Sequence, residues 1–267
     1  MESASPSTGF APKCALPEFT MTTDTMQTQY EKLQGYNFLT NWLHSVRYHN
    51  ILQVMKIFMA ARTSRAPIRI LDIGCGPGKL YGLLDQRFPI DYLGCEIQPD
   101  FIETARSRYG HRPNFKLTDQ SITSGAVPFS GYDLITALET LEHIPEHDVV
   151  RLVEAIAAVR PALFICSVPV EIGPALWLKN VGAWLCRYPR YKEYTWSQTF
   201  WAGCYQLDKV PLHQTSHIGF DWRWLAQTVR HNMKIRELRR SPFPWLPAAI
   251  SSSVFIVAEP RDEQAIL

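Results

Sequence analysis

A cluster of acidic and histidine side chains, "ALETLEHIPEH" at residues 137–147, is the first stretch whose residue types and spacing could do chemistry. One explanation is that His143 acts as a general base toward a hydroxyl nucleophile, while Glu142 orients its imidazole. A second is that Glu139, Glu142 and His143 bind a divalent cation that lowers the pKa of that hydroxyl. A third is a purely structural role. The position of the cluster in the fold must decide among them.

The residues that follow the cluster have the features of an exposed helix start. Pro145 suits the first helical turn, and Glu146 and Asp148 suit the positive end of a helix dipole. We therefore expect Glu146 and His147 to be solvated, and exclude them from the site.

A second motif with chemical potential is "ILDIGCGPG" at residues 70–78, where an apolar run ends and a helix is expected to begin. Glycines in such a turn let a ligand approach the backbone closely. Their spacing differs from the dinucleotide pattern GxGxxG, and Asp72, which closes the strand, suits a cationic ligand better than a pyrophosphate. About twenty residues further on, Glu96 is placed to accept hydrogen bonds from both hydroxyls of a ribose. The three glycines are Gly74, Gly76 and Gly78.

These motifs lie at the ends of predicted strands. Short apolar runs alternate with helical segments, which predicts parallel βαβ units in a doubly wound α/β sheet. In such a sheet, ligands bind beyond the carboxyl ends of the strands. The predicted strands are "IRILDI", "DYLGCE", "NFKLTD", "YDLITALE" and "ALFICSV".

The chain of 267 residues, with 46% hydrophobic residues, can bury one large core. Residues 1–28 are rich in Ser, Thr and Pro, and we expect a flexible tail or lid there. Residues 29–267 are expected to form one domain that begins with a helical segment at residues 30–62. Its longest insertion, residues 170–216, follows the fifth predicted strand.

Charge and cysteine content restrict the class of protein. The net charge of +2 and the lack of a run of five basic residues argue against nucleic acid as a partner. The six cysteines show no metal-binding spacing, which favours free thiols in a reducing compartment. Because the first 31 residues lack the apolar core of a signal peptide, we expect a cytoplasmic protein, with membrane association as a further expectation.

With Asp72, the glycine loop and Glu96 in these positions, residues 68–167 resemble the class I S-adenosylmethionine-dependent methyltransferases, in particular the ubiquinone-pathway O-methyltransferases and the type 11 and 23 group. The resemblance implies a Rossmann-like, mostly parallel seven-stranded sheet with an N-terminal helical cap, and S-adenosylmethionine as the cofactor. "MKIRELRRSPFPWLP" and "SSSVFIVAEP" resemble the final hairpin of that fold. The sequence departs from the family where "VRPALF" replaces the usual "KPGG".

The resemblance also assigns site residues. Asp72 and the glycine loop would hold the methionine part of the cofactor, Glu96 the ribose, and Asp119 would lie beside the adenine. Leu138 and Glu139 would border the cofactor and face the substrate. The cofactor-binding residues expected on this basis are Asp72, Gly74, Cys75, Gly76, Gly78, Glu96, Ile97, Asp119, Gln120 and Leu138.

For the acidic cluster, "ExxEH" is similar to the pattern of the ubiquinone-pathway O-methyltransferases and of the small-RNA ribose methyltransferases, where these positions are associated with a metal. The RNA group has a histidine comparable to His217 in "HQTSHIGFDWRWL". Glu139, Glu142, His143 and His217 are therefore candidate ligands of Mg²⁺. Both the base and the metal explanation stay open, and His217 could equally be structural, preceding a helix capped by Asp221.

Aromatic and basic residues are interleaved along the insertion, which suits a substrate lid, a membrane-facing element at residues 170–205 or an additional piece of core. The ubiquinone-pathway enzymes are similar in having an apolar helix here. We expect methyl transfer to an oxygen of a small, hydrophobic or lipid-linked molecule. The alternatives are a small-RNA ribose 2'-O-methyltransferase, which the near-neutral charge disfavours, and a catalytically silent partner protein, which the intact glycine loop disfavours.

Overall fold

The computed structural model describes residues 38–185, 194–211 and 217–261. The tail or lid predicted for residues 1–28 lies outside the described residues, as does the beginning of the helical segment predicted at residues 30–62. From residue 38 onward that segment is helical, which confirms the N-terminal helical cap in its described part.

One seven-stranded sheet organises the molecule, with the strand order β3-β2-β1-β4-β5-β7-β6. Neighbouring strands from β3 to β5 are parallel, whereas β7 runs antiparallel to both β5 and β6. This confirms the predicted α/β, doubly wound, mostly parallel fold. The strands are β1 (Ile68–Ile73), β2 (Ile90–Cys95), β3 (Phe115–Thr118), β4 (Leu134–Leu138), β5 (Leu163–Pro169), β6 (Lys234–Ser241) and β7 (Ser253–Glu259).

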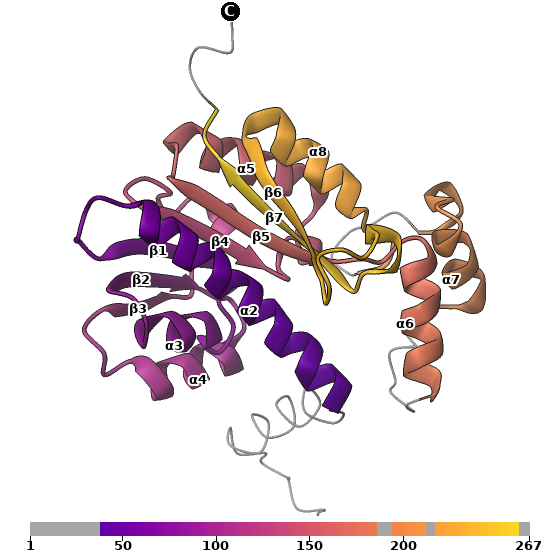
Figure 1. Ribbon diagram of the computed structural model, residues 1–267, viewed down its shortest axis with the longest axis horizontal. Coiled ribbons are helices and arrows are strands. Elements are labelled where there is room, and N and C mark those ends of the chain that lie inside the picture. The colour runs from indigo at the N-terminus through magenta and orange to yellow at the C-terminus, as the bar shows by residue number, and fades with distance from the viewer. Residues whose placement is uncertain (1–37, 186–193, 212–216, 262–267) are drawn as a thin grey trace, which may run out of the picture.

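Helices cover both faces of this sheet (Figure 1). On one face, α2, α3 and α4 bury apolar side chains, and on the other face α5 and α8 do so. The helices are α2 (Phe38–Ala61), α3 (Lys79–Asp85), α4 (Pro99–Tyr109), α5 (Glu146–Val159), α6 (Pro174–Leu185), α7 (Trp196–Gly203) and α8 (Trp222–Asn232).

The two cores follow from the alternation of side chains along each strand. In β1, Ile68 and Ile70 face the core that contains α2 and α3, whereas Leu71 and Ile73 face the core that contains α5. Burying each of these side chains contributes about 1.5–3 kcal/mol to folding. Because both faces are buried, the central strands β4 and β5 are nearly continuous apolar runs, as expected for strands covered on both sides.

After β5 the chain forms a helical hairpin of α6 and α7, which lies beyond the end of the sheet (Figure 1). The hairpin has a small core of its own, built from Leu176, Tyr194, Ala202 and Val210. The Trp177 indole donates a hydrogen bond to the backbone oxygen of Thr199. Part of the insertion is therefore core, which is one of the three explanations, while the lid and the membrane-facing element stay predictions.

The outer face of the same hairpin is apolar and exposed, with exposed fractions of 58% for Trp184 and 77% for Trp196. We call this the hairpin face. Its residues are Trp177, Leu178, Val181, Trp184, Leu185, Trp196 and Phe200. None of the helices in the described part of the chain combines the length and the hydropathy that a bilayer-spanning segment needs.

Candidate active site

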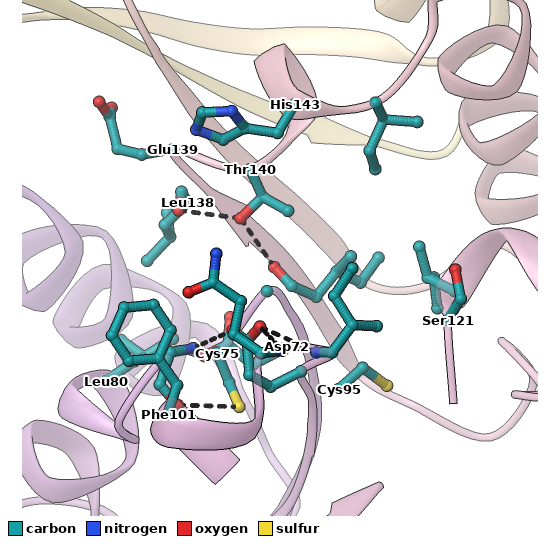
Figure 2. A pocket seen from close by; sticks show the side chains of 18 of the residues that line it. Asp72, Cys75, Leu80, Cys95, Phe101, Ser121, Leu138, Glu139, Thr140 and His143 are labelled. Atoms are coloured by element: carbon teal, nitrogen blue, oxygen red, sulfur yellow. Dashed lines mark hydrogen bonds between the residues drawn. The ribbon is translucent and has the colours of Figure 1, made fainter. Parts of the chain in front are cut away.

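The carboxyl ends of β1, β2 and β4 open into a cavity of about 780 Å³, a size typical of sites for small molecules and cofactors. It lies between Asp72 and Cys75 on one side and Glu139, Thr140 and His143 on the other (Figure 2). The glycine motif and the acidic cluster, separate in the sequence, therefore line the same cavity, as their positions after predicted strands indicated.

The glycine loop needs glycine for two different reasons. Gly74 and Gly76 have φ angles of +68° and +53°, a region in which other residues are strained. A Cβ atom on Gly74 would lie 2.3 Å from the Thr140 hydroxyl oxygen, so close packing excludes a side chain there. A Cβ atom on Gly76 would meet no described atom within 4 Å. At Gly76 the backbone instead faces open space, where a ligand can approach it.

Glu96 ties the end of β2 to this loop. One carboxylate oxygen accepts a hydrogen bond from the Gly76 amide at 2.9 Å, and the other accepts from the Ile97 and Gln98 amides at 2.8 and 2.9 Å. The residue is 8% exposed and lines the cavity. Since each carboxylate oxygen has two lone pairs, Glu96 retains acceptor capacity for a ligand hydroxyl.

Asp72 is a buried carboxyl group with two hydroxyl donors. Its Oδ2 accepts from the Tyr92 hydroxyl at 2.5 Å and its Oδ1 accepts from Thr136 Oγ1 at 2.7 Å. The pKa of Asp72 is raised from 3.8 to about 6, because burial, and to a smaller extent the Glu96 charge, outweighs the two hydrogen bonds, which lower it. A ligand cation would remove much of this penalty, so the site suits a positively charged group.

Eight of the ten predicted cofactor residues line the cavity: Asp72, Gly74, Cys75, Gly76, Glu96, Ile97, Gln120 and Leu138. Gly78 and Asp119 are outside the described lining. Gly78 begins α3, and a Cβ there would touch the Tyr109 ring at 3.0 Å, so its glycine serves packing. Asp119 lines a neighbouring shallow groove together with Arg106. Their predicted roles toward the cofactor stay predictions.

Sequence reasoning missed several cavity residues. Tyr48 of α2 lines the cavity, although the helical periodicity alone did not distinguish it from other residues of that helix. Lys79 and Phe101, at the starts of α3 and α4, also line it. Proximity to the glycine loop and to Glu96 could have identified these two, because helices that follow β1 and β2 begin at the same edge of the sheet.

The acidic cluster forms a 3₁₀ turn, Leu141–His143, after β4. Within this turn, the Glu142 side chain is fully buried, whereas His143 is exposed and lines the cavity. Across from them, the His217 ring lies edge-on to the His143 ring with centroids 4.8 Å apart, and its Nδ1 lies 4.0 Å from a Glu142 oxygen. One potential ligand atom from each of these three residues lies within 4.8 Å of the others.

Glu139 lies outside this three-residue group in the described structure, although it was predicted to be a ligand of the same metal. Its backbone has a φ of +51°, and its carboxylate accepts a hydrogen bond from the Ser167 hydroxyl on β5 at 3.0 Å. The backbone thus turns at Glu139, so the helical spacing of Glu139 and Glu142 does not put both side chains on one face.

The three-residue group matches a magnesium site poorly. Mg²⁺ prefers oxygen ligands at 2.0–2.1 Å, which in octahedral geometry lie about 3 Å apart. Glu142 is the single carboxylate of the group and His143 and His217 are imidazoles, a combination that better suits a transition metal. His217 also precedes α8, whose first turn is capped by Asp221, as predicted, through a 2.8 Å bond from the Arg223 amide.

Comparison with known proteins points to one family. Residues 70–161 match the methyltransferase domain family. A trans-aconitate 2-methyltransferase of Methylobacterium radiotolerans is 36% identical over 83 residues, which cover 31% of this chain and 30% of that protein. A ubiquinone biosynthesis O-methyltransferase of Xanthomonas axonopodis pv. citri is 28% identical over 102 residues, which cover 37% of this chain and 41% of that protein. The chain therefore aligns with less than half the length of either relative.

A structural neighbour extends the comparison to the fold as a whole. The magnesium protoporphyrin IX methyltransferase from Synechocystis, solved with bound SAH, superimposes with a TM-score of 0.58 at 14% sequence identity. The match covers 90% of this chain and 96% of that one. At this level of identity the likeness is one of fold.

Proposed function

We propose that this chain, which contains a class I S-adenosylmethionine-dependent methyltransferase domain, transfers a methyl group to an oxygen atom of a small, hydrophobic or lipid-linked acceptor. The observation that carries the proposal is the pair of carboxylates, Asp72 and Glu96, on either side of a glycine loop that opens into the cavity. The oxygen acceptor is supported by the O-methyltransferase among the relatives.

The cofactor supplies an electrophilic methyl group on a sulfonium sulfur. In the proposal, Asp72 attracts the positively charged methionine part, and Glu96 accepts a hydrogen bond from a ribose hydroxyl at its remaining acceptor position. Leu138 and Ile97 contribute apolar contacts, since both line the cavity. The Gly76 backbone leaves room for the methionine part to approach.

The acceptor is activated by His143 in this proposal. The imidazole takes the hydroxyl proton while the acceptor oxygen bonds to the methyl carbon, and the carbon–sulfur bond breaks with its electrons going to sulfur. His143 is exposed, so the imidazolium can release the proton to water. In the proposal, Glu142, which is buried with one oxygen 4.0 Å from the His217 Nδ1, helps to hold this pair of rings in place.

Calorimetry with S-adenosylhomocysteine tests the cofactor site directly. Wild-type protein should bind it, and Asp72→Ala combined with Glu96→Ala should weaken binding by at least about a hundredfold, because each charged hydrogen bond contributes about 1.5–3 kcal/mol. Labelled S-adenosylmethionine should then label a small-molecule or lipid fraction. Absence of binding to the folded wild type would refute the assignment, and label found solely in RNA would favour the ribose 2'-O-methyltransferase alternative.

A metal-assisted reaction at Glu142, His143 and His217 is the second candidate, because their ligand atoms gather at the cavity. A bound cation would lower the pKa of an acceptor hydroxyl. Under the base mechanism, His143→Ala abolishes activity and EDTA has no effect. Under the metal mechanism, EDTA inhibits turnover without weakening cofactor binding, and an added divalent ion restores it. His147→Ala is the matched control, since His147 is exposed and lies outside the described lining of the cavity.

The proposal includes contact of the hairpin face with a lipid surface or an apolar acceptor. Its tryptophans are exposed, and residues 186–193, between α6 and α7, include the basic residues Arg187, Arg190 and Lys192. Trp184→Ser with Trp196→Ser should reduce sedimentation with anionic vesicles, while Ile57→Ser, at an exposed position on α2, should not. Equal sedimentation of all three proteins would contradict membrane contact, and reduced turnover alone would favour a substrate lid.

A further inference from the structure

The Asp72 carboxylate is held by hydroxyl groups from the strands on both sides of β1. Thr136 is the direct partner of Asp72 in the β1–β4 register, so its short side chain reaches one carboxylate oxygen. On β2 the partner of Asp72 is Gly94, which has no side chain. Tyr92, two residues earlier and on the same face, spans the distance with its phenol ring and donates to the other oxygen at 2.5 Å.

The ring of Tyr92 is itself fixed by neighbouring aromatic side chains. It stacks on Phe115 with centroids 5.6 Å apart and meets Tyr81 edge-on at 5.3 Å. Tyr92 is 2% exposed, and the described lining of the cavity does not include it. Its hydroxyl therefore acts on the cavity through Asp72 and not by contact with a ligand.

We propose that Tyr92 is a positioning residue of the cofactor site, which holds the Asp72 carboxylate in the orientation and the charged form that the methionine part of S-adenosylmethionine needs. This inference rests on the proposed function, because it assumes that Asp72 faces the cofactor. It assigns a role to a residue of β2 that lies outside both sequence motifs.

The groups around Asp72 explain why its charged form depends on hydroxyl donors. Glu96 and Tyr92 are the ionisable groups that shift the pKa of Asp72, and Cys75 and Cys95 are the other ionisable groups that interact with it. Burial raises the pKa values of Cys75 and Cys95, so both thiols are neutral, while the Glu96 charge disfavours a second negative charge nearby. Burial also raises the pKa of Tyr92 well above its usual range, which keeps its hydroxyl protonated and able to donate.

Without the Tyr92 hydroxyl, the pKa of Asp72 would rise from about 6 toward neutrality. In a large fraction of the molecules, Asp72 would then have to lose its proton before a cationic ligand could bind at pH 7. The affinity for the cofactor would therefore change with pH around neutrality. A substitution that merely loosens packing would instead weaken binding by the same factor at every pH.

The test compares Tyr92→Phe with Tyr81→Phe, which removes a hydroxyl from the same aromatic cluster. The Tyr81 hydroxyl donates to Asn114 at 2.8 Å and is thus directed away from Asp72. The dissociation constant of S-adenosylhomocysteine would be measured by calorimetry between pH 5.5 and 9. For a rise of about one pKa unit, we expect Tyr92→Phe to bind roughly twofold more weakly than wild type at pH 7 and almost tenfold more weakly at pH 5.5, with the difference disappearing toward pH 9. Tyr81→Phe should follow the wild-type profile.

Three outcomes distinguish the inference from the proposed function. If wild type binds and Tyr92→Phe shows the wild-type pH profile, the positioning role is wrong and the proposed function stands. If wild type itself does not bind, the proposed function fails and the inference with it. If Tyr92→Phe does not fold by circular dichroism, Thr136→Val carries the test, because it removes the other donor to Asp72; a wild-type pH profile of that variant would overturn the inference.

Discussion

Replacing Asp72 by asparagine should make the ligand-free protein more stable at neutral pH while removing its affinity for the cofactor. The native carboxyl group has a pKa of about 6, compared with 3.8 for an ordinary aspartate. Because the folded state binds the proton more tightly than the unfolded state, folding stability falls as the pH rises from about 4 to about 6 and then levels off. At about 1.4 kcal/mol for each tenfold change, the ionised carboxylate costs roughly 3 kcal/mol at pH 7.

Asparagine keeps the size of the side chain and cannot ionise, so Asp72→Asn should recover up to that amount at pH 8 and about a third of it at pH 4.5. Urea denaturation of both proteins at the two pH values measures this difference, in which the contributions of other titrating groups cancel. Thermal denaturation should show an increase of roughly 2–4 °C for each kcal/mol. The reasoning fails if the variant is less stable than wild type at pH 8, or if the difference is the same at both pH values.

Three further predictions concern the loop, the hairpin and the ribose site. Gly74→Ala should lower the free energy of unfolding, measured with urea, by about 1–3 kcal/mol more than Gly76→Ala does. The reason is that a Cβ atom would collide with the Thr140 side chain at Gly74 but would meet no described atom at Gly76; equal losses in the two variants would contradict this. Lys179 forms an ion pair with the fully buried Glu171 at 3.1 Å. Lys179→Met should therefore lower the free energy of unfolding by about 3–5 kcal/mol, because it removes the partner of a buried charge, and adding Glu171→Gln should recover most of this loss in the same assay. Glu96→Gln should weaken S-adenosylhomocysteine binding in calorimetry by about tenfold or more, and unchanged affinity would exclude the ribose role.

Local sequence patterns were sufficient to predict the five parallel strands and the cavity loop, whereas the final hairpin of β6 and β7 was predicted from the family resemblance. The apolar runs that became β1, β2 and β4 are buried on both faces, so their composition identifies them without knowledge of their neighbours. The glycine loop and Glu96 follow these strands directly. Since parallel strands end at the same edge, the sequence order alone brings them together.

Contacts that depend on register or on the path of the backbone could not be predicted in the same way. The bond from Tyr92 to Asp72 requires the pairing of Asp72 with Gly94, which no local pattern encodes. The separation of Glu139 from Glu142 results from one residue with a positive φ, a conformation that sequence does not assign to a glutamate. The position of His217 near His143 was predicted from the family resemblance alone. The two residues are too far apart in the sequence for helix or strand periodicity to relate them.

The position of β7 constrains how the domain can be made on the ribosome. This strand follows β6 in the sequence but lies between β5 and β6 in the sheet, antiparallel to both. Until residues 253–259 have left the exit tunnel, β6 has no neighbour in the sheet and the fully buried strand β5 presents an open edge. Open apolar edges are templates for wrong pairing and aggregation. Translation therefore produces most of this domain before its sheet can close, and the edge of β5 is covered only once β7 has been made and released.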